Sequence, residues 1–149
     1  MQGIYHIGDE NSEQAERVMY LRFVVADYIH EDSQRQLGVF QAVADIRRWG
    51  WLSPYEEEQH DVLREWFNVH LEKPSRFTAS KPPYYRKQSK AISWFKDSAK
   101  EHIARARSLV RILENHGVSA TTIKTRRVGY VVYEDEYQIT AEPFAGKRD

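Results

Sequence analysis

The chain has 149 residues, with 22 basic and 22 acidic side chains and no cysteine. The lack of cysteine excludes a disulfide framework, cysteine-ligated zinc, iron–sulfur clusters and thiol catalysis, and it favours a cytoplasmic location. No apolar run approaches the roughly 18 residues of a membrane span. The N-terminal stretch MQGIYHI is too short for a signal peptide and lacks its positive charge. We therefore expect one soluble domain over residues 1–149 that makes no membrane contact.

Charge is unevenly distributed along the chain. Residues 1–75 hold 7 basic and 14 acidic side chains, whereas residues 76–149 hold 15 and 8. This asymmetry indicates either an anionic partner for the basic half or an acidic half that folds against the basic half. The sequence leaves both interpretations open.

The N-terminal segment is predicted to contain a lead-in followed by a strand. Residues 1–15 are mostly polar and are expected to be disordered or to form a short extended start. Residues 20–28 are rich in aromatic and β-branched side chains with alternating apolar positions, which favours a strand. A helix over 15–29 is the alternative, because several apolar residues there also fit a 3.6-residue period.

Two helices are predicted on either side of the sequence WGWLSP. The first covers 35–49, ends at Gly50, and its apolar face consists of Val39, Phe40, Val43 and Ile46. The second begins at Ser53, which is followed by Pro54 and Glu56 in the order of a capping box. Its apolar face consists of Val62, Leu63, Trp66, Phe67 and Leu71. The short connection predicts an antiparallel helix pair.

The middle of the chain is predicted to form a surface loop over 75–90, a strand over 91–95 and a long helix. The helix runs from Ser98, which forms a capping box with Glu101, to a stop at Gly117. Its apolar stripe consists of Ala99, Ile103, Ala106, Val110 and Leu113. A basic stripe beside it consists of Lys96, Lys100, Arg107 and Arg111.

Three β-prone runs follow, over 118–127, 128–136 and 137–143, and they predict an antiparallel meander. Residues 144–149 form a tail that is expected to be disordered. The predicted fold is therefore α+β, with a mainly antiparallel sheet of four or five strands and about three helices packed on one face.

No catalytic motif is present. The chain has no glycine-rich phosphate or dinucleotide loop, no nucleophile elbow and no zinc-protease motif. Glu57 and His60 have the spacing of a carboxylate-bridged metal bundle, but the second copy that such a site needs is missing. We therefore expect the stretch around them to be a solvated first turn of the helix. The other histidines lack ligand or triad patterns and are expected at exposed or edge positions: His30, His70, His102 and His116. We predict no metal and no cofactor.

The segment 76–127 combines cations with aromatic rings. Nucleic-acid surfaces use cations to displace counterions and rings to stack on unpaired bases. The residues that would contact such a ligand are Tyr84, Tyr85, Arg86, Lys87, Lys90, Lys96, Lys100, Arg107, Arg111, Arg126 and Arg127. No RNA-recognition, KH or zinc-finger motif accompanies them.

Aromatic side chains suggest a third kind of surface. The chain has 9 tyrosines and 4 tryptophans, and such residues dominate protein interfaces when they are partly exposed. The simplest interpretation places the tryptophans in the core, except that Trp51 is the best candidate for an exposed anchor in the turn between two helices. Our first prediction is a non-enzymatic binding or adaptor protein that contacts a protein partner or itself as a homodimer. The alternatives are nucleic-acid binding and an enzyme acting on an anionic small molecule, with a pocket built from distant residues such as His102, Arg107, Arg126 and Tyr130.

Overall fold

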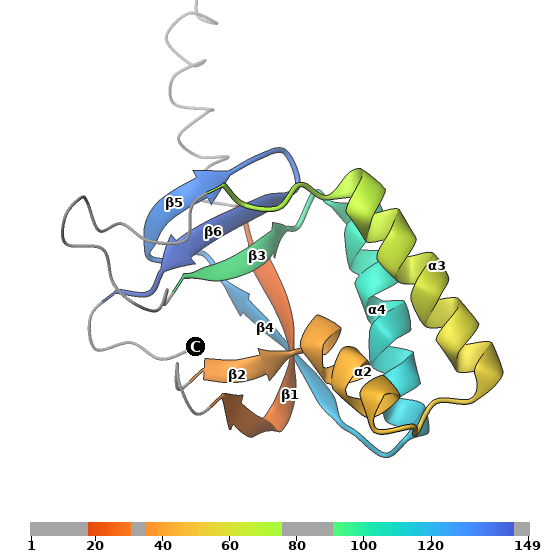
Figure 1. Ribbon diagram of the computed structural model, residues 1–149. Coiled ribbons are helices and arrows are strands. Elements are labelled where there is room, and N and C mark those ends of the chain that lie inside the picture. The colour runs from red at the N-terminus through yellow and green to blue at the C-terminus, as the bar shows by residue number, and fades with distance from the viewer. Residues whose placement is uncertain (1–17, 31–34, 76–90, 145–149) are drawn as a thin grey trace, which may run out of the picture.

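The computed structural model describes residues 18–30, 35–75 and 91–144, which form three helices and a six-stranded sheet (Figure 1). In chain order the elements are β1 (Tyr20–His30), β2 (Arg35–Gly38), α2 (Val39–Arg48), α3 (Pro54–His70), β3 (Ile92–Lys96), α4 (Lys100–Asn115), β4 (Ala120–Thr125), β5 (Tyr130–Glu134) and β6 (Gln138–Glu142). The predicted α+β class is confirmed. The sheet has one strand more than the upper prediction, because residues 35–38 pair with β1 instead of starting a helix.

Strand β1 is the centre of the sheet, and its pairing confirms the predicted strand and excludes the alternative helix. One edge pairs with β4 without interruption, from Tyr20 opposite Thr125 to Val25 opposite Ala120. The other edge pairs first with β3, at Leu21 opposite Phe95, and further along with β2, at Val24 opposite Gly38. The neighbours of β1 therefore change within a few residues on this edge.

The C-terminal strands form only part of the predicted meander: β5 and β6 pair as an antiparallel hairpin, but β4 does not pair with β5. Strand β6 pairs with both β3 and β5, while β4 pairs with β1, so that β4 and β5 lie at opposite ends of the order β4-β1-β3-β6-β5. Only residues 126–129 connect them, and that linker spans at most roughly 18 Å. The sheet must therefore curl strongly to bring its two ends close together.

Gly129 shows how tightly the curled sheet is packed at the start of β5. Its φ is 119°, and a Cβ placed there would lie 2.0 Å from the Glu142 carbonyl oxygen. Since L side chains rarely adopt this φ and no side chain fits this contact, the position requires glycine. The backbones of the linker and β6 touch directly.

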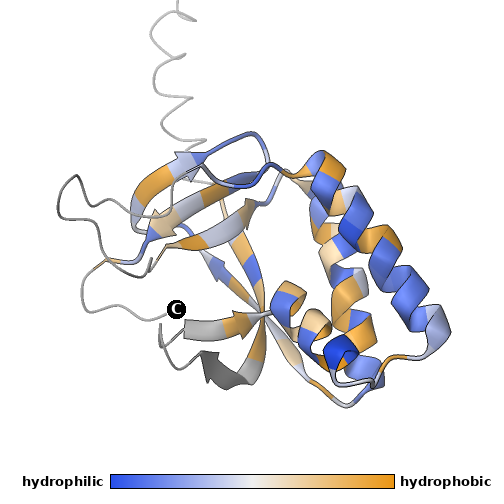
Figure 2. Ribbon diagram, in the orientation of Figure 1, coloured by the Kyte–Doolittle hydropathy of each residue, from blue (hydrophilic) through white to orange (hydrophobic). Residues whose placement is uncertain are grey.

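The three helices pack on one face of the sheet and share one core with it (Figure 1). Alternate β1 residues and β3 contribute Leu21, Phe23 and Phe95, and α4 lies against them with Leu109 and Leu113. Figure 2 shows that α3 is largely hydrophilic on the side seen there, as expected for the outer helix. The predicted apolar stripe from Ala99 to Leu113 is confirmed, since all five of its residues are buried or partly buried.

Helices α2 and α3 contact each other in antiparallel order, as predicted. Phe40 near the start of α2 packs on Phe67 near the end of α3, with ring centroids 4.9 Å apart. Arg47 near the end of α2 bonds Asp61, closer to the start of α3. Two residues assigned to apolar faces are not core residues: Phe40 is 41% exposed and Val62 is 58% exposed. In both helices the buried face is narrower than the sequence pattern predicted.

The capping predictions had opposite outcomes. At α3 the Glu56 amide donates to Ser53 Oγ over 3.2 Å and the Ser53 amide donates to Glu56 Oε1 over 3.0 Å, which is the predicted capping box. At α4 the prediction was wrong, because the helix begins at Lys100 and has no side-chain cap. Ser98 instead lies inside a tight turn, closed by the Ala99 amide donating to the Lys96 carbonyl over 2.9 Å.

A smaller core occupies the opposite face of the sheet, inside its curl. Its buried members are Ile92, Trp94, Val128, Ile139 and Ala141. Tyr20 and Ile123 pack against them from β1 and β4. Both faces of β3 are therefore covered, one by helices and one by neighbouring parts of the curled sheet.

Candidate functional site

Two neighbouring tryptophans form an exposed aromatic surface between α2 and α3. Gly50 lies between them with a φ of 81°, which favours glycine and ends α2. Leu52 is only 8% exposed and anchors the turn in the core, whereas Trp49 and Trp51 remain 57% and 49% exposed. Their ring centroids are 5.5 Å apart. We call this pair the Trp49–Trp51 surface.

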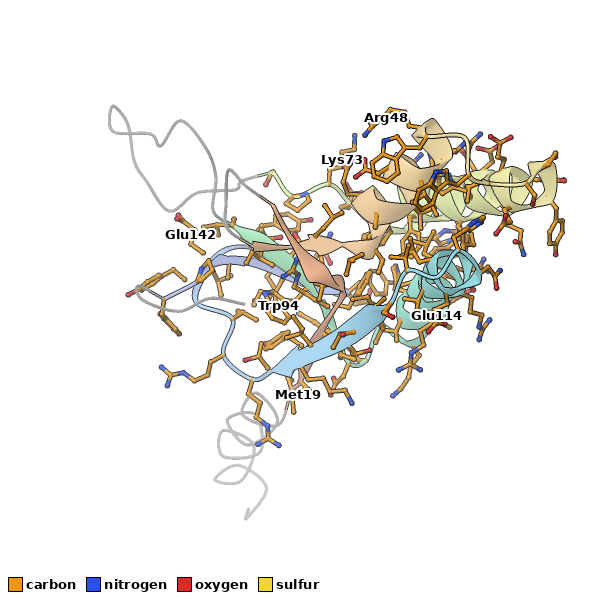
Figure 3. All side chains as sticks on the ribbon, turned by 90° about the horizontal axis from the view of Figure 1, so that it is seen from below. Met19, Arg48, Lys73, Trp94, Glu114 and Glu142 are labelled. Atoms are coloured by element: carbon orange, nitrogen blue, oxygen red, sulfur yellow. The ribbon has the colours of Figure 1, made fainter. Side chains whose placement is uncertain are left out.

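The exposure of Trp51 agrees with its choice as an exposed anchor. The core interpretation is wrong for Trp49, because the helix ends there and its side chain leaves the buried face of α2. It is right for Trp94, which is 5% exposed, and partly right for Trp66, which is half-buried against the main core. Figure 3 shows Trp94 among the strands and Arg48, next to Trp49 in sequence, at the outer side of the helices.

Polar contacts fix the backbone on both sides of this surface. Arg47 donates to Asp61 Oδ1 over 2.6 Å and lies 3.9 Å from Glu57. The hydrogen bond from Arg47 lowers the pKa of the Asp61 carboxyl below its ordinary value. Glu56 accepts from His116 Nε2 over 2.9 Å, which joins the start of α3 to the end of α4. These contacts hold the helix ends on both sides of the two tryptophans.

Three residues of the predicted basic row lie together on α4. Lys100, Arg107 and Arg111 lie on one helix face and are exposed, and in the described part of the chain none of them forms an ion pair. Lys96 does not belong to this row, because it ends β3 and binds Glu134 over 2.6 Å. The acidic residues near the start of α3 pair with Arg47 and His116 and not with the basic row. They therefore do not neutralise the positive charge of that row.

The remaining predicted contact residues do not join the row. Arg126 and Arg127 lie in the linker between the two ends of the sheet, not at the tip of a hairpin, and both are exposed. The Arg127 guanidinium lies 5.2 Å from the centroid of the Phe144 ring. The other five residues, which are Tyr84, Tyr85, Arg86, Lys87 and Lys90, lie outside the described residues.

Two histidines are more buried than predicted. His102 is 4% exposed; its ring lies 4.7 Å from that of Trp66 and 4.3 Å from that of Tyr137, and its Nε2 donates to the His70 carbonyl over 2.8 Å. It serves as a core residue with a satisfied donor, which periodicity alone could not distinguish from an exposed one.

His60 is 3% exposed, and its Nδ1 lies 3.1 Å from an Arg47 nitrogen. Since a guanidinium only donates, Nδ1 accepts and the ring is neutral. Burial lowers the pKa of His60, and the charge of Arg47 lowers it further. The solvated first turn proposed for this stretch is therefore wrong at His60. The side chain of His30 lies outside the described residues.

The residues suggested for an enzymatic pocket do not come together. His102 lies in the core beneath α3, whereas Tyr130 packs on Phe144 at the β5 edge, with ring centroids 4.9 Å apart. A pocket beside β1 and β3 is lined by none of the four. Among the described residues, no three histidine, aspartate or glutamate side chains gather closely enough to hold a metal ion.

Comparison with family models, curated proteins and solved structures found no significant match to this chain. Over the ranges described here, no helix has both the length and the apolar character needed to cross a membrane.

Proposed function

We propose that this protein is a non-enzymatic binding protein that associates with a second copy of itself through the Trp49–Trp51 surface. The observation that carries the proposal is the exposure of two adjacent tryptophans, at 57% and 49%, on a backbone fixed by ion pairs. Tryptophan is enriched among the residues that contribute most to protein association.

The charges around this surface favour a symmetric partner. Basic residues end α2 and acidic residues begin α3, and the exposed side chains include both Arg48 and Glu58. A two-fold interface places each patch against its own copy, so a surface carrying both signs can complement itself. Arg48 of one copy would then face the acidic turn of the other.

The tryptophans set the expected strength of the interface. Burying the exposed half of one indole removes about 100 Å² of apolar surface and contributes about 2.5 kcal/mol. A two-fold dimer carries each substitution in both copies, so replacing either tryptophan by alanine removes about 5 kcal/mol and should weaken association by roughly several thousand-fold.

Sedimentation velocity over a wide range of protein concentrations tests the proposal. The wild-type chain should form a dimer, and both Trp49→Ala and Trp51→Ala should shift the equilibrium to monomer. Val69→Ala is the matched control, because Val69 is 68% exposed near the other end of α3. A wild-type chain that remains monomeric at high concentration, or a dimer that neither tryptophan variant weakens, would overturn self-association through this surface.

Nucleic-acid binding stays a prediction, supported by the exposed Lys100, Arg107 and Arg111 on one face of α4. Anisotropy titrations with single- and double-stranded DNA and RNA test it. Binding should weaken steeply with salt, because each phosphate contact releases counterions. No binding at low salt would remove this function.

A further inference from the structure

The linker between the two ends of the sheet is held in one shape. Thr125 Oγ1 accepts from the Arg127 amide over 3.1 Å and donates to the Arg127 carbonyl oxygen over 3.1 Å. Val128 is buried in the smaller core, and Gly129 touches the β6 backbone. Residues 125–129 therefore form a fixed turn on the side of the sheet away from the helices (Figure 1).

This turn presents cations without acidic neighbours. Residues 120–133 carry three basic side chains and no acidic one. Arg126 and Arg127 are exposed, and in the described part of the chain neither of them forms an ion pair. Glu142, which lies opposite Tyr130 in β6, is only 3% exposed. The surface of the turn is therefore positively charged, which favours an anionic partner.

Two aromatic rings accompany these cations. The Arg127 guanidinium lies 5.2 Å from the centroid of the Phe144 ring. The Tyr130 ring meets the Phe144 ring edge to face, with centroids 4.9 Å apart and an angle of 79° between the planes. Such a contact leaves at least one face of the Tyr130 ring uncovered by Phe144, and Tyr130 is 57% exposed. We call Arg126, Arg127, Tyr130 and Phe144 the Arg–Tyr cluster.

Cations and an open ring on one fixed turn match the two chemical features of single-stranded nucleic acid. Its phosphates pair with arginine, and its unpaired bases stack on aromatic rings. In a duplex, neighbouring base pairs cover the faces of each base, so the ring would find no stacking partner. A single nucleotide fits less well, because small-molecule sites bury most of the ligand surface, whereas this ring is half open to solvent.

We infer that the Arg–Tyr cluster binds single-stranded nucleic acid. An unpaired base stacks on Tyr130, and the adjacent phosphates bind Arg126 and Arg127. The inference rests on the nucleic-acid prediction above, for which it names the ligand and a site on the sheet, separate from the basic row of α4. It does not depend on self-association through the Trp49–Trp51 surface.

Anisotropy titration at low salt tests the inference with three labelled ligands of about 12 nucleotides, a length within the usual site size. They are an oligothymidylate, an abasic strand with the same number of phosphates, and a duplex. The wild-type chain should bind the oligothymidylate more tightly than the abasic strand. Tyr130→Leu should weaken oligothymidylate binding by about 5- to 150-fold and leave the other two affinities unchanged, because it removes only the stacking contact. Arg126→Gln should lower the salt slope for both single strands by about 0.7.

Tyr55→Leu is the matched control, because Tyr55 is 69% exposed at the start of α3, and it should change none of the three affinities. The inference is overturned if the abasic strand binds as tightly as the oligothymidylate, or if Tyr130→Leu binds the oligothymidylate as the wild type does. In the second case, weaker binding by Arg107→Gln would keep nucleic-acid binding and assign it to α4. No binding of any strand would overturn the nucleic-acid prediction as well. Loss of the dimer in Tyr130→Leu would make the cluster a protein contact and would also overturn the inference.

Discussion

Replacing Gly129 by alanine should destabilise the fold far more than the same change at the other glycines with positive φ. A Cβ at Gly129 would lie 2.0 Å from the Glu142 carbonyl oxygen and 2.9 Å from the Pro143 Cα, at a φ of 119°. Backbone strain at such a φ costs about 1–3 kcal/mol. Forcing two backbones apart in a packed region adds about 1–3 kcal/mol.

The sum, about 2–6 kcal/mol, is a large part of the 5–15 kcal/mol that typically stabilises a protein. Gly117→Ala is the control, because its φ of 75° imposes strain but no atom lies within 4 Å of the new Cβ. It should cost only about 1–2 kcal/mol. The difference between the two variants isolates the steric contact between the linker and β6.

Urea denaturation followed by circular dichroism measures both free energies of unfolding. The expected order is wild type, then Gly117→Ala, then Gly129→Ala. Equal losses for the two variants would refute the close approach of these backbones, and with it the tight curl at the start of β5.

Three further predictions concern the helical layer. Ser53→Ala should lower the free energy of unfolding by about 1 kcal/mol, whereas Ser98→Ala should have almost no effect, and equal losses would contradict the observed caps. Leu63→Ala should cost about 2–5 kcal/mol and Val62→Ala less than about 0.5 kcal/mol, because the first side chain is 8% exposed and the second 58%; thermal denaturation compares them. The folded chain protonates His60 less readily than the unfolded chain, whose histidine titrates near 6.5. Stability should therefore be complete above that pH and fall below it, and the fall should be smaller in His60→Gln; an identical pH dependence in that variant would refute the assignment.

The elements with strong local signals could be predicted from the sequence. The start of α3 follows from Ser53, Pro54 and Glu56, because all of the hydrogen bonds in a capping box lie within one turn. Alternation over 20–28 predicted β1 because one of its faces is buried against helices. Glycines marked the ends of α2 and α4 for the same local reason, since Gly50 and Gly117 have positive φ.

Errors arose where contacts distant in sequence decide the structure. Ser98 and Glu101 match a capping box, but the turn that closes β3 places Ser98 outside the helix. The final strands resemble a meander, yet β4 pairs with β1, a partner about a hundred residues away in the chain. Nothing within either segment encodes that choice.

The candidate sites follow the same division. Trp51 could be chosen from its place in a short turn, because a turn lies at the surface. The pocket beside β1 and β3 could not be predicted from the sequence. It exists only because β2 replaces β3 as the neighbour of β1, next to the first turn of α2. The burial of His60 and His102 was equally invisible, since each depends on side chains from another helix or strand.

The sequence by itself thus determined the α+β class, the positions of most helices and strands and the exposed turn, because these depend on periodicity and on hydrogen bonds between near neighbours. The tertiary structure decided strand order, the curl of the sheet, the charge pairs of α3 and the pocket. These features depend on which segments, distant in sequence, pack against each other. The free energy of that burial comes from pairs of segments, so no single segment encodes it.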